Sequence, residues 1–322
     1  MIHLTRARAN ALLLLTAVIW GFAFVAQRTG MEHVGPFTFN AVRFFIGGLV
    51  LVPFIVIRER QKAGETPAIQ AAAVGQQESP QGRQSVVNRR PILIGGTIAG
   101  LVLFVAATLQ QTGIIFTTAG KTGFITSLYV VLVPLLGLAV GHRVSAAGWV
   151  GAILAVVGLY FLTIEGGLRM GWGDLLVLFG AFLWAIHFLL LGRLSPGNDP
   201  VRLALMQFWT CAALSLGVAL LTEPLSVAGL GPAMPAILFT GILSIGVGYT
   251  LQVVAQGHTR PADTAIILSL EAVFAVIGGW LLLDEQLTTR ALLGCGLMLA
   301  GILVSQLVGR PEAEEAVAEI SH

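Results

Sequence analysis

The chain has 322 residues, of which 56% are hydrophobic and only 11% charged, and its formal net charge is +2. Soluble domains carry about 25% charged residues, so a soluble protein of this size could not cover its surface with so few charges. The composition excludes soluble enzymes, nucleic-acid-binding proteins and secreted disulfide-rich domains, and it predicts a chain surrounded by lipid.

Ten segments of the chain are long and apolar enough to cross a bilayer, for which a helix needs roughly 20 residues. The first segment follows Arg6 and Arg8, as a signal peptide would, but it is too long and lacks a clear cleavage site, so we expect a retained helix. The predicted spans are residues 9–28, 36–57, 91–116, 121–141, 145–164, 172–193, 201–222, 233–257, 263–283 and 289–309. The sequence therefore predicts an all-α polytopic membrane protein with ten transmembrane helices.

Two stretches of the chain fall outside these spans. Residues 58–90 are rich in Gln, Glu, Arg, Ser and Pro, and because this composition cannot bury a core, we expect a disordered cytoplasmic loop. Residues 311–322 contain four glutamates and are predicted to form an acidic cytoplasmic tail.

Positive charges predict the orientation, because loops rich in Lys and Arg stay in the cytoplasm. With ten spans, both termini and the even-numbered loops share one side, which holds 13 of the 18 Lys and Arg residues. The other side holds four, and Arg43 lies within a span. We therefore expect a multi-pass protein of the cytoplasmic (inner) membrane with both termini in the cytoplasm.

An internal repeat appears when the chain is compared with itself. One alignment of the two halves places Trp20 on Trp184, and a second places residues 101–128 on 243–270, where 10 of 28 positions are identical. One five-helix unit is therefore present twice. Because five is an odd number, the second copy enters the membrane from the opposite side, and such inverted repeats are typical of alternating-access carriers.

The two predicted repeats cover residues 9–164 and 171–309, and their sequences resemble a known family. The segments AVIWGFAFVAQRTG, SLEAVFAVIGGWLLLDE and GWVGAILAVVGL are similar to the EamA family of the drug/metabolite transporter superfamily. The resemblance implies a ten-helix carrier that moves small metabolites, often amino acids outward, without ATP. Many members have Pro directly after the Glu of the ninth helix, whereas Ala272 follows Glu271 here, so no proline kink is predicted at this point.

Two charged residues lie deep within the predicted spans. Glu271 follows Asp263 by eight residues, which places it roughly 12 Å into the membrane. Arg43 follows Pro36 by seven residues, about 10 Å below the other surface. A charge at such depth is costly, so each is a candidate for substrate or proton transport. The alternatives are a protonated glutamate bound to a neighbouring helix and an arginine that extends to the surface.

We expect Arg43 and Glu271 to pair in an empty cavity, because each charge alone would be expensively desolvated. Their repeat counterparts are uncharged: Gln207 for Arg43 and Tyr129 for Glu271. We expect both counterparts to lie near the same cavity.

Trp20 and Trp184 lie near mid-depth, away from the interface where most membrane tryptophans occur. They are predicted either to line a substrate cavity or to pack in the core. His187, three residues after Trp184, either relays protons or forms a structural hydrogen bond. Gln110 and Gln252 lie late in their spans and are predicted at a gate or an interface.

Lys121 begins the fourth span and either extends to the surface or binds a carboxylate at the outer mouth. Its repeat counterpart Asp263 is predicted to cap a helix. The GKT at residues 120–122 is not a nucleotide-binding loop, because Ile115 stands where that loop needs Gly. Cys211 and Cys295 are far apart, and no spacing of His, Cys or carboxylates suggests a metal or another cofactor.

The sequence therefore predicts a secondary transporter for small polar or amphipathic metabolites, with amino-acid export as the leading hypothesis and no catalytic residues. Its expected partners are a small-molecule substrate and the lipid bilayer, with proton coupling as an option, without nucleic acid, and as a monomer or weak homo-oligomer. The alternatives are a membrane enzyme acting on a lipid-linked substrate and a non-transporting membrane scaffold. The predicted cavity and transport residues are Trp20, Arg43, Lys121, Tyr129, Trp184, His187, Gln207 and Glu271.

Overall fold

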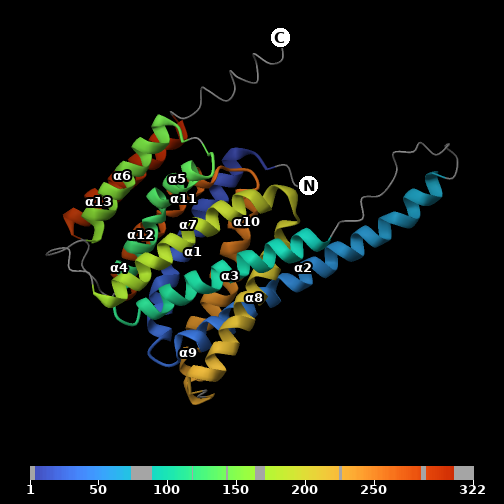
Figure 1. Ribbon diagram of the computed structural model, residues 1–322, viewed down its shortest axis with the longest axis horizontal. Coiled ribbons are helices and arrows are strands. Elements are labelled where there is room, and N and C mark those ends of the chain that lie inside the picture. Colours follow the sequence, from blue (N-terminus) through green and yellow to red (C-terminus); the bar gives the residue numbers. More distant parts are fainter. Residues whose placement is uncertain are drawn as a thin grey trace, which may run out of the picture.

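The computed structural model describes residues 4–73, 89–117, 119–142, 144–163, 171–224, 227–283 and 288–307, and every element in these residues is helical (Figure 1). The elements of the first half are α1 (Arg6–Gly30), α2 (Pro36–Ala73), α3 (Arg89–Gly113), α4 (Ala119–Ser127), α5 (Tyr129–Ala139) and α6 (Ala146–Thr163). Those of the second half are α7 (Trp172–Leu194), η1 (Ser195–Gly197), α8 (Pro200–Thr222), α9 (Val227–Leu238), η2 (Phe239–Tyr249), α10 (Thr250–Gln256), α11 (Pro261–Leu268), α12 (Glu271–Leu283) and α13 (Thr289–Leu307).

The predicted all-α fold is confirmed for the described residues, and the described part of each of the ten predicted segments is mostly helical. Among these residues, eight helices or continuous helix runs are long and apolar enough to cross a membrane, while Ala146–Gly158 and Leu292–Ser305 are shorter apolar helices. Three spans are interrupted, namely α4–α5, α11–α12 and α9–η2–α10, the last through a π-helical segment. The chain is therefore a multi-pass membrane protein with broken helices, which the apolar pattern did not predict.

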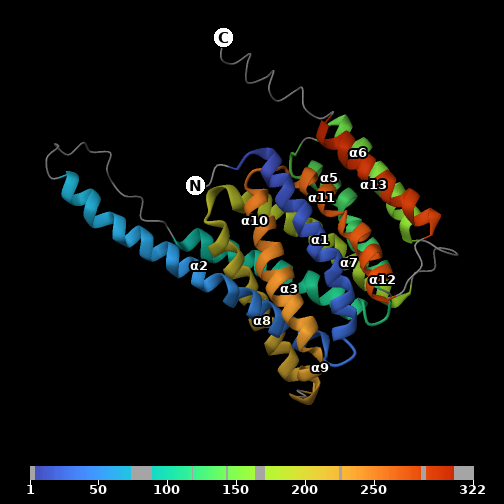
Figure 2. The same ribbon diagram turned by 180° about the vertical axis from the view of Figure 1, so that it is seen from behind.

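The helices of the two halves pack against each other instead of forming two separate bodies. Helix α1 packs on α12 and η2, α3 lies against α7 and α8, and α2 lies against α8. Helices α6 and α13 form a close pair at one edge of the bundle (Figures 1 and 2). The cavity described below therefore has walls from both halves.

Ionic contacts mark the two ends of the bundle. We call the end that carries Arg6, Arg260 and Asp263 the amino-terminal face, and the end that carries Lys121 and Asp174 the opposite face. Arg6 begins α1 and ion-pairs with Asp263 of α11, whereas Lys121 of α4 ion-pairs with Asp174 of α7. Because α1 has 25 residues, the two faces lie about 37 Å apart along this helix.

The prediction of a disordered loop at residues 58–90 was wrong for the first part of this range. Helix α2 continues to Ala73 and extends beyond the bundle (Figures 1 and 2), and α3 already begins at Arg89. The low hydrophobicity of residues 58–73 does not prevent helix formation, because Arg, Gln, Lys, Glu and Ala are all good helix formers. Residues 74–88 and the predicted tail 311–322 lie outside the described residues.

Glycines allow α6 and α13 to approach closely. A Cβ atom on Gly158 would lie 2.6 Å from the carbonyl oxygen of Gly294, and one on Gly151 would lie 2.7 Å from that of Gly301. Small residues at such contacts let helix backbones approach each other in a membrane. The seven-residue spacing of these glycines in both helices therefore serves packing.

We expect Gly158→Leu to destabilise the protein by about 1–3 kcal/mol, because the new side chain overfills the contact between α6 and α13. The matched control is Gly296→Leu, since Gly296 of α13 has open space around its Cα. Thermal unfolding of the detergent-purified variants measures the effect. Equal unfolding temperatures for the two variants would contradict this account of the helix pair.

Candidate functional site

A small cavity of about 30 Å³ lies in the interior of the bundle. This volume has room for about two water molecules. Its walls come from both halves of the chain and combine aromatic rings, amides and two charged residues. The lining residues are Trp20, Ala23, Phe24, Gln27, Arg43, Gln110, Thr126, Tyr129, Trp184, Phe188, Ser244, Ile245, Tyr249 and Glu271.

The cavity lies between mid-depth and the opposite face. Gln27 and Gln110 each lie three residues before the end of their helix at that face, and Arg43 lies seven residues after the start of α2 there. Trp184 and Glu271 lie near the middle of their spans. The half of the bundle nearer the amino-terminal face contains fully buried side chains such as Phe208.

A hydrogen bond between the two halves lies at the floor of the cavity. The hydroxyl of Tyr129 donates to Oε1 of Glu271 at 2.9 Å, and the hydroxyl of Ser127 donates to the same oxygen at 3.4 Å. Tyr129 and Glu271 are 1% and 2% exposed. A buried carboxylate needs such donors, because it has lost its hydration.

Both partners of this hydrogen bond begin the second part of a broken helix. The α4–α5 break lies at Leu128, immediately before Tyr129, and the α11–α12 break lies at Ser269 and Leu270, immediately before Glu271. In each break the leucine N–H donates to a carbonyl three residues earlier, at 3.2 Å. The chain therefore breaks beside Glu271 although Ala272 stands where many family members have proline.

Arg43 lines the cavity without forming the ion pair that we expected. It is 3% exposed, and its Cζ lies 5.4 Å from the Phe39 ring centre and 5.1 Å from that of Phe44. Its Nε has no hydrogen-bond partner among the described residues, and no ion pair in this part of the chain joins it to Glu271. Aromatic faces stabilise the guanidinium, while Tyr129 takes the place of Arg43 beside the carboxylate.

Three aromatic rings form one wall of the cavity. The ring centres of Trp20 and Tyr249 lie 4.5 Å apart, and those of Trp184 and Tyr249 lie 5.8 Å apart. Nε1 of Trp20 donates to the carbonyl of Ser244 in the π-helical segment η2, at 3.1 Å. Because π-helical segments are frequent at functional sites, η2 is a candidate element for shaping the cavity.

Gln110 forms hydrogen bonds with three other residues that line the cavity. Its Oε1 accepts hydrogen bonds from Nε1 of Trp184 at 2.8 Å and from the hydroxyl of Thr126 at 3.4 Å, and its Nε2 donates to Oε1 of Gln27 at 3.4 Å. Sequence reasoning did not single out Gln27 or Tyr249 as site residues. Gln27 was detectable as an amide within the apolar first span, whereas Tyr249 offered no signal, since its repeat counterpart is Ala107.

Five of the eight predicted site residues line the cavity: Trp20, Arg43, Tyr129, Trp184 and Glu271. The structure places the other three elsewhere. His187 and Gln207 are fully buried in the half nearer the amino-terminal face, where His187 Nε2 lies 2.8 Å from Gln207 Oε1. Lys121 lies at the opposite face, 3.5 Å from Oδ2 of Asp174. Repeat position alone therefore does not place a residue in this cavity.

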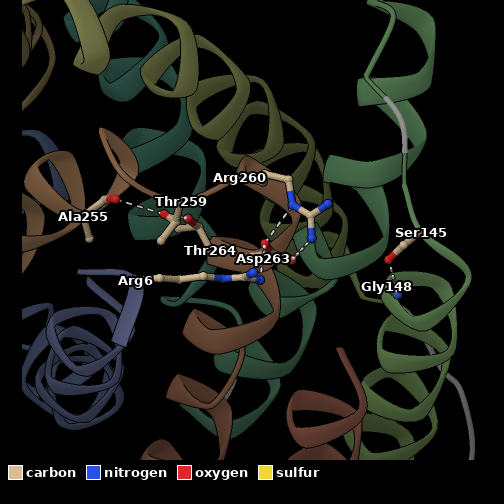
Figure 3. A network of polar contacts seen from close by, with 8 residues as sticks. All are labelled: Arg6, Ser145, Gly148, Ala255, Thr259, Arg260, Asp263 and Thr264. Atoms are coloured by element: carbon tan, nitrogen blue, oxygen red, sulfur yellow. Dashed lines mark hydrogen bonds and ion pairs between the residues drawn. The ribbon is translucent and has the colours of Figure 1, made fainter. Parts of the chain in front are cut away.

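Asp263 is not the predicted helix cap. It lies in the first turn of α11, whose capping residue is Arg260. Its carboxylate accepts from Arg260 Nε at 2.9 Å and from Arg6 at 3.2 Å, so both arginines converge on it (Figure 3). Three residues with charged side chains thus link the start of α1 to the start of α11.

The chain is similar to known transporters along nearly its whole length. A family model described as the EamA-like transporter family matches residues 7–164 and 171–307. An uncharacterized transporter of Archaeoglobus fulgidus is 30% identical over 303 residues, which cover 94% of this chain and 87% of the relative. The uncharacterized inner membrane transporter YedA of Escherichia coli is 24% identical over 234 residues, 71% of this chain and 65% of the relative.

A solved crystal structure of a protein has the same fold. It superposes with a TM-score of 0.71 at 19% sequence identity, covering 95% of this chain and 99% of that chain.

We expect Tyr129→Phe to lower the free energy of unfolding by about 1.5–3 kcal/mol if Glu271 is ionised, because a buried carboxylate loses its closest donor. Ser127→Ala should cost less, since its hydrogen bond is longer. Thermal unfolding measures both, with the exposed Tyr160→Phe as the control. In a Glu271→Gln background the effect of Tyr129→Phe should shrink. An unchanged effect there would show that the hydroxyl acts through something other than Glu271.

Proposed function

This chain belongs to the EamA-like transporter family, and from this we propose that it is a secondary carrier of small zwitterionic metabolites, with amino acids as the leading class. It works by alternating access and without ATP. Outward movement of the substrate is the proposed direction. We assign no catalytic residue or cofactor to it.

The observation that carries this proposal is a buried cavity with a cation and a carboxylate that do not pair with each other. Among the described residues, no partner binds Nε of Arg43, and Glu271 accepts hydrogen bonds only from hydroxyl groups. A planar guanidinium suits a substrate carboxylate, to which it can donate two parallel hydrogen bonds. Glu271 can accept from a substrate ammonium group. An α-amino acid carries both groups at once.

The rest of the cavity suits an apolar substrate side chain. Trp20, Trp184 and Tyr249 provide ring faces and edges, and Phe188 lines the cavity with them. Burial of apolar area against such rings contributes about 25 cal/mol per Å². Amphipathic amino acids are better candidates than neutral sugars, which carry neither a carboxylate for Arg43 nor an ammonium group for Glu271.

Alternating access finds support in the relation between the halves. Tyr129 and Glu271 occupy corresponding positions in the two repeats, and each follows a helix break. Broken helices near mid-depth, in two inverted repeats, are the usual binding region of secondary transporters. We propose that residues 9–164 and 171–309 are these inverted repeats.

The proposed location is the inner membrane, the membrane given in the name of the relative YedA. The excess of Lys and Arg in the loops and tails of one side favours a cytoplasmic amino-terminal face. Proton coupling is an option within this scheme. If Glu271 takes up a proton, its hold on the substrate ammonium is lost, and release follows.

Counterflow in proteoliposomes tests the proposed function. Vesicles loaded with a mixture of unlabelled amino acids should take up labelled amino acids from outside, transiently above equilibrium and without ATP. Separate vesicles loaded with nucleosides or sugars serve as controls for substrate class. Exchange of sugars alone would refute the amino-acid assignment, and the absence of any exchange would argue against a carrier.

We expect Glu271→Gln to abolish exchange or to uncouple it from protons, and Arg43→Lys to lower it at least about tenfold, because lysine lacks the planar fork. Counterflow at matched protein content measures both, together with the double variant Arg43→Gln/Glu271→Gln. Arg290→Lys is the matched control, since Arg290 also lies over two aromatic rings, at 5.2 and 5.6 Å, but outside the cavity. Near-normal exchange by Glu271→Gln would remove this residue from the site.

A further inference from the structure

Three buried polar side chains between the cavity and the amino-terminal face have unused hydrogen-bonding atoms. His187, Gln207 and Gln252 are all 0% exposed. Among the described residues, no partner binds Nδ1 of His187, Nε2 of Gln207 or Oε1 of Gln252. Buried polar atoms of this kind are rare in native structures and require an explanation.

Two sets of polar contacts connect these residues to α7. Nε2 of His187 lies 2.8 Å from Oε1 of Gln207, and Nε2 of Gln252 donates to Oε1 of Gln256 at 3.2 Å. Gln256 in turn donates to the carbonyl of Phe188, the residue after His187, at 3.1 Å. Helices α8 and α10 thus each make a polar contact with α7, at the neighbouring residues His187 and Phe188.

Each of the three residues is the repeat counterpart of a residue that lines the present cavity. In the two alignments of the halves given above, the counterparts of His187, Gln207 and Gln252 are Ala23, Arg43 and Gln110, in this order. Their depths also correspond. Gln207 follows the start of α8 by seven residues, just as Arg43 follows the start of α2.

We infer that His187, Gln207 and Gln252 form a second substrate half-site, which opens to the amino-terminal face in the alternate conformation of the carrier. This inference rests on the proposed function, because it requires the two repeats to exchange conformations. In that exchange, each residue moves to the position around Trp20, Trp184, Tyr129 and Glu271 that its repeat counterpart now occupies. The unpartnered atoms then meet substrate or water.

The ion pairs at the two faces fit this exchange. Arg6 and Asp263 join α1 to α11 at the amino-terminal face, as Figure 3 shows, and Lys121 and Asp174 join α4 to α7 at the opposite face. Since α4 corresponds to α11 and α1 to α7, the two pairs join corresponding helices with reversed charges. Opening toward the amino-terminal face therefore requires the pair of Arg6 and Asp263 to separate.

The chemistry of the half-site suits a zwitterion without offering it a formal charge. Because Oε1 of Gln207 can only accept, Nε2 of His187 is the donor between them, and Nδ1 of the neutral ring is left as an acceptor. A substrate ammonium can donate to Nδ1 of His187 and to Oε1 of Gln252. A substrate carboxylate can accept from Nε2 of Gln207. Affinity should be lower here than beside Arg43, since charged hydrogen bonds are stronger.

Cysteine accessibility tests the half-site directly. Gln207→Cys and Gln252→Cys are each made in a Cys211→Ala/Cys295→Ala background, with and without Asp263→Asn. A membrane-impermeant methanethiosulfonate reagent is then applied to proteoliposomes from the amino-terminal face. Asp263→Asn weakens the contact with Arg6, so both cysteines should react at least about tenfold faster in its presence, and the amino-acid mixture that supports counterflow should slow the reaction.

Val253→Cys is the matched control for this experiment. Val253 is 0% exposed and follows Gln252 directly in α10, so its side chain points to another side of that helix. Its repeat counterpart Gln111 does not line the cavity. Simple loosening of the bundle would label Val253→Cys as well, whereas opening of the half-site leaves it unreactive. Equal labelling at all three positions, or none at Gln207→Cys and Gln252→Cys, would overturn the inference.

If a cysteine variant fails to fold, the KM of a double variant tests the half-site. The double variant His187→Phe/Gln207→Leu removes both partners of their hydrogen bond together. The KM for amino acids supplied from the amino-terminal face should rise about tenfold, because the half-site loses a donor and an acceptor. The KM from the opposite face should change less than about twofold. Equal changes at both faces would contradict a half-site that opens to one side.

Different results would refute the carrier function and the second half-site. If the unaltered chain shows no counterflow, the carrier function itself is wrong, whatever the cysteines do. If counterflow proceeds and neither cysteine becomes reactive, the carrier function stands and only the second half-site is wrong.

Discussion

A carboxylate buried in the middle of a membrane-spanning bundle must find its hydrogen-bond donors inside the protein, because lipid offers none. Glu271 finds them in Tyr129 and Ser127, which belong to the other half of the chain. This contact requires the α4–α5 and α11–α12 breaks to face each other at one depth. The walls of the cavity follow from that meeting point, since α1, α7 and η2 pack around it.

The sequences of the two halves are similar, but side chains at corresponding positions of the candidate site differ in charge. The position of Arg43 in the first half is taken by Gln207 in the second, and the position of Glu271 is taken by Tyr129. One half therefore supplies the cation of the cavity and the other supplies the carboxylate. Under the proposed function, a zwitterionic substrate would contact both groups in one orientation.

Spacing along the helices predicted the depth of the site residues but not their neighbours. Arg43 and Glu271 lie on the same cavity, as their distances from the helix starts indicated, yet Tyr129 and not Arg43 binds the carboxylate. His187 and Gln207 were also predicted cavity and transport residues, but they lie outside the cavity and face each other. Transmembrane helices are apolar on nearly all sides, so the sequence contains little information on how each helix is rotated about its axis.

The sequence by itself determined the all-α membrane class, the ten apolar segments, the repeated pattern and the family, because these depend on composition and on periods along the chain. Only the tertiary structure decided where helices break, as at Leu128 and Leu270, and that α2 continues to Ala73. It alone also decided which polar groups meet. The physical reason is that a buried polar side chain binds the donor or acceptor that packing brings closest, and packing joins residues more than a hundred positions apart.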